Sequence, residues 1–226
     1  MNLTSTSPLS HQRHGTNMAA QTNPRNKLAE TIRNRWVRDD PHYDKPRLLL
    51  AYYEQPQDPA NPRVALMIAP KFERDKSGQL KLPIPATKYY VHNTLVTHQG
   101  DVAQPWRFAR VDTSNLDDEP NLLICVVIGK VLDPERAPDV LSAIPVYQDH
   151  MYMFGSRIWV EQAIEIMLAA GITTGLYART ALGGADSYLK EKRAEGRWSQ
   201  QCGGRRVWPA PTVPILDMTT GKQERT

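Results

Sequence analysis

The feature that most constrains the fold of this chain is an apolar run near its middle, LLICVVIGKVL at residues 122–132. An almost unbroken apolar run of this length, rich in β-branched residues, is typical of a strand that is covered on both faces. We therefore expect it to lie at the centre of a β-sheet. Segments with aromatic and β-branched residues predict four further strands, at 47–55, 63–71, 87–93 and 105–111.

Helical patterns follow the strands along the chain. We expect helices from Asp133 to about Ile144, from Ser156 to Ala170, and from about Ala185 to Glu195. In the last of these, Tyr188 and Leu189 are expected to point inward, with the Lys, Arg and Glu side chains on the solvent side. Strands grouped first and helices grouped after them are typical of an α+β protein. The predicted fold is a mostly antiparallel sheet of about five strands with helices packed on it.

The chain divides into three predicted parts. Residues 1–46 are polar and are expected to form a mostly disordered N-terminal extension with a short helix at 27–38. Residues 47–198 are expected to form a single α+β core domain. Residues 199–226 are rich in Gly and Pro and are expected to form an irregular C-terminal tail.

The net charge of +4 is unevenly distributed along the chain. Residues 1–47 and 187–226 each carry eight basic and four acidic groups, whereas residues 48–186 carry twelve basic and sixteen acidic groups. A dedicated nucleic-acid-binding domain would carry its basic surface on the fold itself, so only weak nucleic-acid binding through the basic tails remains as an alternative. No apolar run is long enough to span a membrane, and residues 1–30 lack the apolar core of a signal peptide, which favours a cytoplasmic protein.

No motif for a nucleotide, a dinucleotide, a catalytic zinc or a nucleophile elbow is present, so we expect no cofactor. His11 and His14 in the N-terminal segment are interpreted as solvated side chains, and the polar run 39–44 as a linker. Cys125 lies in the apolar run, where burial would keep its thiol unreactive. Cys202, beside two arginines, is the more reactive thiol if it is exposed.

Three consecutive carboxylates, Asp117, Asp118 and Glu119, come just before the apolar run. Two interpretations remain open for them. The carboxylates could together bind Mg²⁺ or a cationic group, or they could form a solvated turn before Pro120.

The order of segments along residues 47–198 resembles a known arrangement. RLLLAYYEQ, RVALMIAPK, KYYVHN and WRF are followed by LLICVVIGKVLD, IPVYQD, FGSRIWVEQAIEIML and KEKRAEGRW. This order resembles a group of small fungal proteins, and also the circularly permuted papain-like folds of the NlpC/P60 and lecithin:retinol acyltransferase type. The resemblance implies a permuted papain-like fold in which a strand histidine activates a cysteine at a helix N-terminus.

The resemblance places the nucleophile at Ser156, the strand histidine at Arg63 and the second-strand residue at Tyr90, and all three differ from the family pattern. Arginine cannot accept a proton at neutral pH, and serine is a weak nucleophile without a base. His92 or His150 could supply that base. Ser156 also suits a helix cap, and Tyr90 a packed aromatic position.

Two functions follow as hypotheses. The first is a non-catalytic papain-like protein that binds a protein partner or a small molecule, with Arg63 contacting an anionic group. The second is a hydrolase, an acyltransferase or a tailoring enzyme of a fungal biosynthetic pathway, in which Ser156 acts with Tyr90 and His92.

Overall fold

The structure is a computed structural model, which describes residues 44–98, 101–148, 154–197, 199–200, 206–207 and 212–225. The helix expected at 27–38 lies outside these residues, as do His11, His14, His150 and Cys202. None of the helices in the described part of the chain has the length and apolar character needed to cross a membrane.

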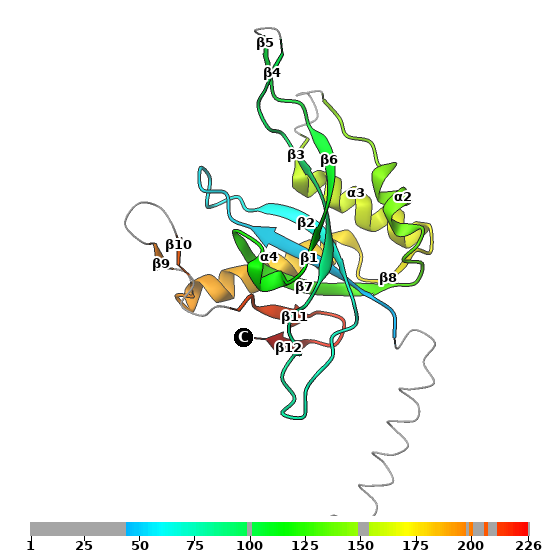
Figure 1. Cartoon of the computed structure of the whole chain (residues 1–226), viewed down its shortest axis with the longest axis vertical. Helices are drawn as coiled ribbons and strands as arrows, with labels where there is room; N and C mark the ends of the chain where they lie inside the picture. Colours follow the sequence, from blue (N-terminus) through cyan, green and yellow to red (C-terminus); the bar gives the residue numbers. More distant parts are fainter. Residues whose placement is uncertain are drawn as a thin grey trace, which may run out of the picture. The chain divides into compact units, whose positions relative to one another are not determined.

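The main sheet has eight strands in the order β12-β11-β7-β1-β2-β3-β6, with β8 paired to β7 (Figure 1). The strands are β1 (Arg47–Tyr53), β2 (Arg63–Ala69), β3 (Ala86–His92), β6 (Arg107–Thr113), β7 (Leu122–Val131), β8 (Thr173–Gly175), β11 (Ile215–Asp217) and β12 (Lys222–Arg225). Every pair in this sheet is antiparallel except β11 with β7. The predicted α+β class with a mostly antiparallel sheet is confirmed, but the sheet has eight strands rather than about five. Two short hairpins pair β4 (Val96–His98) with β5 (Asp101–Ala103), and β9 (Ser199–Gln200) with β10 (Arg206–Val207).

The apolar run forms β7, as predicted, and all but one of its ten residues are buried. It lies between β1 and β11, and both of its faces are covered. On one face Ile124 and Val126 join the larger apolar cluster, and on the other Cys125 and Val127 join a second cluster. A strand that packs on both sides needs apolar residues at every position, which explains why the run shows no alternation.

Three described helices pack on one face of the sheet, which we call the helix face. They are α2 (Ala137–Ser142), α3 (Ser156–Ala169) and α4 (Ala178–Ala194). Trp159 of α3 is fully buried there and contacts Phe108 of β6, with ring centroids 5.7 Å apart. The opposite face, which we call the loop face, is covered by apolar residues of connecting segments, including Ile84, Leu116 and Val213.

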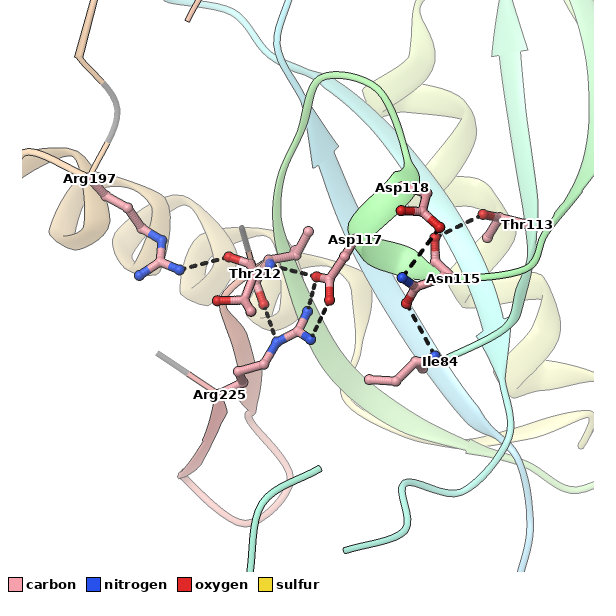
Figure 2. Close-up of polar contacts among 9 residues, drawn as sticks. Ile84, Thr113, Asn115, Asp117, Asp118, Arg197, Thr212 and Arg225 are labelled. Carbon is pink, nitrogen blue, oxygen red and sulfur yellow. Dashed lines mark hydrogen bonds and ion pairs between the residues drawn. The ribbon is translucent and has the colours of Figure 1, made fainter. Parts of the chain in front are cut away.

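The prediction of an irregular C-terminal tail is wrong for the described residues, because β11 and β12 belong to the main sheet. Their three and four residues are too few to show a periodic pattern. They are held by contacts that are distant in sequence, above all the paired hydrogen bonds from Arg225 to Asp117 (Figure 2). Asp117 lies in η1 (Leu116–Asp118), the turn before β7.

Helix α4 begins at Ala178 rather than near Ala185, so it is longer than predicted. Gly183 and Gly184 argue against a helix by propensity, because glycine costs about 1 kcal/mol relative to alanine in a helix interior. A Cβ at position 184 would lie 2.0 Å from Cε of Met218, which follows β11. Close packing against the C-terminal strands therefore accounts for a small residue at Gly184.

Tyr188 and Leu189 of α4 point inward as predicted, but Lys192 does not lie on a solvated face. Its side chain is only 3% exposed, and its ammonium group pairs with Glu195 at 2.8 Å and lies 5.2 Å from the centre of the Tyr188 ring. The aliphatic stem of lysine can be buried when its charged end finds a partner.

Candidate functional site

An open cleft of about 940 Å³ lies between the loop that follows β1, the N-terminal end of α3 and one side of α4. The charged residues that line it are Arg63, Arg157, Asp186, Lys190 and Arg193. We call it the cationic cleft, because four basic side chains face one acidic side chain. The volume lies within the range typical of small-molecule sites.

Asp186 forms the best-defined polar network of the cleft. Arg157, at the second position of α3, donates two hydrogen bonds to its carboxylate, at 3.0 and 2.7 Å. The Tyr52 hydroxyl, at the end of a fully buried ring on β1, donates a third at 2.7 Å. Three elements far apart in the sequence are thus joined at one carboxylate, which fixes the direction of the Arg157 guanidinium.

The charges in this network are stable at neutral pH. Burial alone would raise the pKa of Asp186, but hydrogen bonds from Arg157 and Tyr52 outweigh it, so this pKa lies below its ordinary value. The hydrogen bond to Asp186 is the main cause that raises the pKa of Arg157, and burial is the main cause that raises the pKa of Tyr52. The network therefore consists of a carboxylate, a guanidinium and a neutral phenol.

The other basic groups of the cleft come from β2 and α4. Arg63, the first residue of β2, donates from Nε to the Gln55 side chain at 3.2 Å. Lys190 and Arg193 follow Asp186 by four and seven positions on α4, so all three share one helix face. Arg193 also donates to the Pro59 carbonyl at 2.7 Å, which ties α4 to the loop after β1.

Ser156 lies at the first position of α3 and lines the cleft. Its Oγ accepts a hydrogen bond from the backbone N–H of Val64 at 3.2 Å, which links α3 to β2. Among the described residues no imidazole or carboxylate is hydrogen-bonded to this oxygen. A hydroxyl that accepts one bond keeps its proton for donation, so Ser156 can still donate to a group in the cleft.

Tyr90 and His92 do not point toward Ser156. Their neighbours in β3, Tyr89 and Val91, belong to the cluster on the helix face, and strand alternation directs Tyr90 and His92 to the loop face. The two rings contact each other at 5.6 Å. The sheet thus separates both residues from the side on which α3 packs, while Arg63 and Ser156 are brought together in the cleft.

Trp106 provides the largest apolar wall of the cleft. Its ring meets Phe154 edge to face, with centroids 5.5 Å apart. The Gln148 side chain accepts from the Trp106 backbone N–H at 2.9 Å and donates to its carbonyl at 2.8 Å. The side-chain amide thereby pairs with the backbone just before β6 and fixes the position of Trp106.

Two of the three carboxylates before β7 form ion pairs, and the third, Asp118, is exposed. Asp117 pairs with Arg225, and Asp118 accepts a weak bond from Asn115 at 3.4 Å (Figure 2). Glu119 pairs with Lys88. The Asp117 and Glu119 side chains are only 9% and 7% exposed, so the interpretation as a solvated turn is wrong for these two residues and holds only for the exposed Asp118. The interpretation as a magnesium site has no support either, since in the described part of the chain no three acidic, His or Cys side chains are grouped to hold a metal ion.

Cys125 is fully buried, and burial raises the pKa of its thiol to about 12. A thiol with so high a pKa stays protonated at neutral pH, which agrees with the predicted unreactive core residue.

The resemblance identified Arg63 and Ser156, but the sequence did not identify the other residues of the site described above: Tyr52, Trp106, Arg157, Asp186, Lys190 and Arg193. The residues after 186 were interpreted as part of a basic chain end, and the charged side of α4 as a solvated face. The spacing of Asp186, Lys190 and Arg193 was visible in the sequence. Nothing in the sequence shows that this face borders a cleft.

Comparison with known proteins identifies a family. The chain belongs to a family of unknown function, DUF6914, whose model matches residues 45–224. The match extends over both C-terminal strands, so the family unit is larger than the predicted core of 47–198. No curated protein and no solved structure gives a match.

Proposed function

We propose that the protein binds a small anionic molecule, bearing phosphate or carboxylate groups, in the cationic cleft and performs no chemistry on it. The observation that carries this proposal is the charge of the lining, four basic side chains against one acidic side chain. Asp186 neutralises one of these charges, that of Arg157, so the lining keeps a net positive charge of three. Basic side chains on converging walls attract anions and form their strongest hydrogen bonds with them.

Two further features support binding rather than catalysis. Among the described residues no side chain that could act as a general base is hydrogen-bonded to Ser156. Arg63 lies at the position where the resemblance would place a histidine. Serine needs an adjacent base to become a nucleophile. The hydroxyl of Ser156, with its oxygen engaged by Val64, is suited to donate to an anion.

The test is calorimetric titration of the full chain with inorganic phosphate and with citrate at low ionic strength. We expect Arg63→Gln and Lys190→Gln each to weaken binding about tenfold, because a hydrogen bond to a charged group contributes about 1.5–3 kcal/mol. The matched controls are Arg136→Gln and Lys76→Gln, two exposed basic residues outside the cleft, which should bind as the native chain does. The proposal fails if neither anion binds, or if the controls weaken binding as much as the cleft variants.

The hydrolase hypothesis makes a different prediction. It requires turnover of an activated ester or amide by the purified protein, and loss of that turnover in Ser156→Ala. On our proposal neither protein hydrolyses the ester, and Ser156→Ala weakens only anion binding. Turnover that Ser156→Ala removes would replace the binding proposal.

We also propose that the fold is a permuted papain-like scaffold in which Ser156 occupies the position of the former thiol. The order of the strands before α3, and the contact of Ser156 with β2, support this idea. Restoring the thiol tests it, because a helix N-terminus and a donated N–H lower the pKa of a cysteine. We expect Ser156→Cys, in a Cys202→Ser background, to react with iodoacetamide with an apparent pKa below the ordinary value near 8.5. An ordinary or raised pKa would remove this support.

A further inference from the structure

A second, smaller cavity of about 160 Å³ lies on the loop face at the same end of the sheet. Its walls include Tyr53, Val64, Lys88, Tyr90, Val91 and Pro120. We call it the tyrosine cavity. Engineered cavities of about 150 Å³ hold a benzene ring, so its size suits one ring or a similarly compact apolar group.

Two polar groups in the walls of the tyrosine cavity, those of Tyr53 and Lys88, contact the same carboxylate, Glu119. The Lys88 ammonium pairs with Glu119 and lies 4.9 Å from the centre of the Tyr53 ring and 5.2 Å from that of Tyr90. The Tyr53 hydroxyl donates to the same Glu119 carboxylate at 3.1 Å. The rest of the lining combines ring edges and aliphatic carbon with the side chains of Glu54 and Asn121. A wall that contains a carboxylate disfavours a second anion, while the ring edges and aliphatic carbon accept a compact uncharged ring.

Arg63 is the link between the two cavities, because it lines both of them. As the first residue of β2 it lies at the end of the sheet, where the helix face meets the loop face. Strand alternation directs its side chain toward the loop face, with Ala65, while its Nε reaches Gln55 at the rim of the cationic cleft. An anion held by Arg63 in the cleft therefore lies beside the tyrosine cavity.

We propose that the two cavities are subsites of one ligand, an anion joined by a short chain to an aromatic ring. The anionic group binds in the cationic cleft, and the ring enters the tyrosine cavity past Arg63. This inference rests on the proposed anion binding. Joining two weakly bound groups makes the second contact intramolecular, so the joined molecule binds more tightly than either group alone, provided that the linker spans the two sites.

The experiment is calorimetric titration of the full chain with a series of ω-phenylalkyl phosphates of increasing linker length, beside inorganic phosphate and the matching alkyl phosphates. We expect one linker length to bind at least about tenfold more tightly than inorganic phosphate, with weaker binding for shorter and longer linkers. The alkyl phosphate of the same length should lack most of this gain in affinity over inorganic phosphate.

Variants of Tyr90 locate the ring. Tyr90→Ala should remove the gain of the best phenylalkyl phosphate without changing the affinity for inorganic phosphate, and Tyr90→Phe should retain it. Tyr177→Ala is the matched control, because Tyr177 is 69% exposed and lines neither cavity. Thermal melting establishes that each variant is folded, and the comparison of linker lengths still tests the proposal if Tyr90→Ala is not.

The two proposals fail in different ways. If inorganic phosphate binds but no phenylalkyl phosphate binds more tightly, the subsite proposal is wrong and anion binding stands. The same holds if affinity rises steadily with linker length, or if the gain survives in Tyr90→Ala. If no phosphate compound binds at all, both proposals are wrong.

Discussion

Two arginine–carboxylate pairs in this protein have the same geometry of two parallel hydrogen bonds but differ in their exposure to solvent. Arg225 donates to both oxygens of Asp117 at 2.9 and 2.6 Å, and their side chains are only 12% and 9% exposed. Arg157 donates to both oxygens of Asp186 at 3.0 and 2.7 Å, but their side chains are 49% and 46% exposed. Similar distances thus accompany very different contact with water.

The difference shows which pair maintains the fold and which one shapes the cleft. The buried pair is surrounded by bonds to the same segment: Asp117 accepts from the Val213 N–H at 2.8 Å, and Arg225 donates to the Val213 carbonyl at 2.7 Å. It fastens β11 and β12 to the turn before β7 (Figure 2). An exposed pair contributes little to stability because water screens it. The main consequence of the exposed pair is the fixed direction of Arg157 in the cleft.

The largest loss of stability is expected when one partner of the buried pair is removed. Asp117→Ala leaves the Arg225 guanidinium buried without its counter-charge, which should cost about 3–5 kcal/mol of the free energy of unfolding. Urea denaturation of the full chain measures this change. A loss below about 1 kcal/mol would show that the pair does not hold the C-terminal strands.

Removing both charges of the buried pair together separates the cost of an unpaired charge from the cost of the lost hydrogen bonds. Asp117→Leu combined with Arg225→Met leaves no unpaired charge, so it should recover most of the stability that Asp117→Ala loses. The two single variants serve as controls in the same urea titration. A double variant as unstable as the sum of the singles would mean that specific hydrogen bonds, rather than an unpaired charge, dominate the cost.

A smaller loss of stability is expected at Tyr52, the buried member of the network around Asp186. Tyr52→Phe removes the buried hydroxyl that donates to Asp186, and should cost about 1 kcal/mol. It should also weaken phosphate binding, because Asp186 then holds Arg157 less firmly. Tyr147→Phe, on a tyrosine outside the cleft that is 43% exposed, is the control for both the urea and calorimetric measurements. A phosphate affinity unchanged by Tyr52→Phe would contradict the role assigned to this hydroxyl.

The smallest change in stability is expected for Asp186→Asn, at or below about 1 kcal/mol at neutral pH, because the pair with Arg157 is half exposed. The folded state holds the pKa of Asp186 below its ordinary value of 3.8. Its contribution is therefore complete above that value and is lost as the pH falls through the lower pKa of the folded state. The difference in stability between the native chain and Asp186→Asn should shrink between neutral pH and pH values below about 4. A difference that grows on acidification would contradict this assignment.

The sequence predicted the centre of the fold well, because burial imposes a local pattern there. The apolar run became β7, the four other predicted strands became β1, β2, β3 and β6, and the helix from Ser156 was found with its start at the right residue. Apart from β6, each of these elements packs buried residues of its own against a core, so its composition alone identifies it. β6 has no buried residue, and its partly buried Phe108 packs against the cluster on the helix face.

The sequence did not predict the C-terminal strands or the start of α4, because contacts with distant residues, rather than a local burial pattern, stabilise them. β11 and β12 are short, and Arg225 is 108 residues away from the Asp117 that holds it. The glycines at the start of α4 fit the helix only because Met218 packs against Gly184. Contacts between residues so far apart leave no periodic signal in either segment.

The candidate site, too, was predicted only in part from the sequence. The resemblance pointed to Arg63 and to Ser156 at the start of a helix, and the charge count located a basic excess after residue 186. The structure places part of that excess, Lys190 and Arg193, on the wall of the cleft rather than in a loose tail. It also directs Tyr90 and His92 to the other face of the sheet.

By itself, the sequence determined an α+β fold around one buried strand, because side chains that leave water must be apolar in a regular pattern. Only the tertiary structure decided which charged residues meet. A charged side chain is compatible with solvent, with a buried pair or with a cleft, and the same residue types serve in all three. The folded chain alone distinguishes Asp117, which fastens the C-terminal strands, from Asp186, which fixes the direction of an arginine in the cleft.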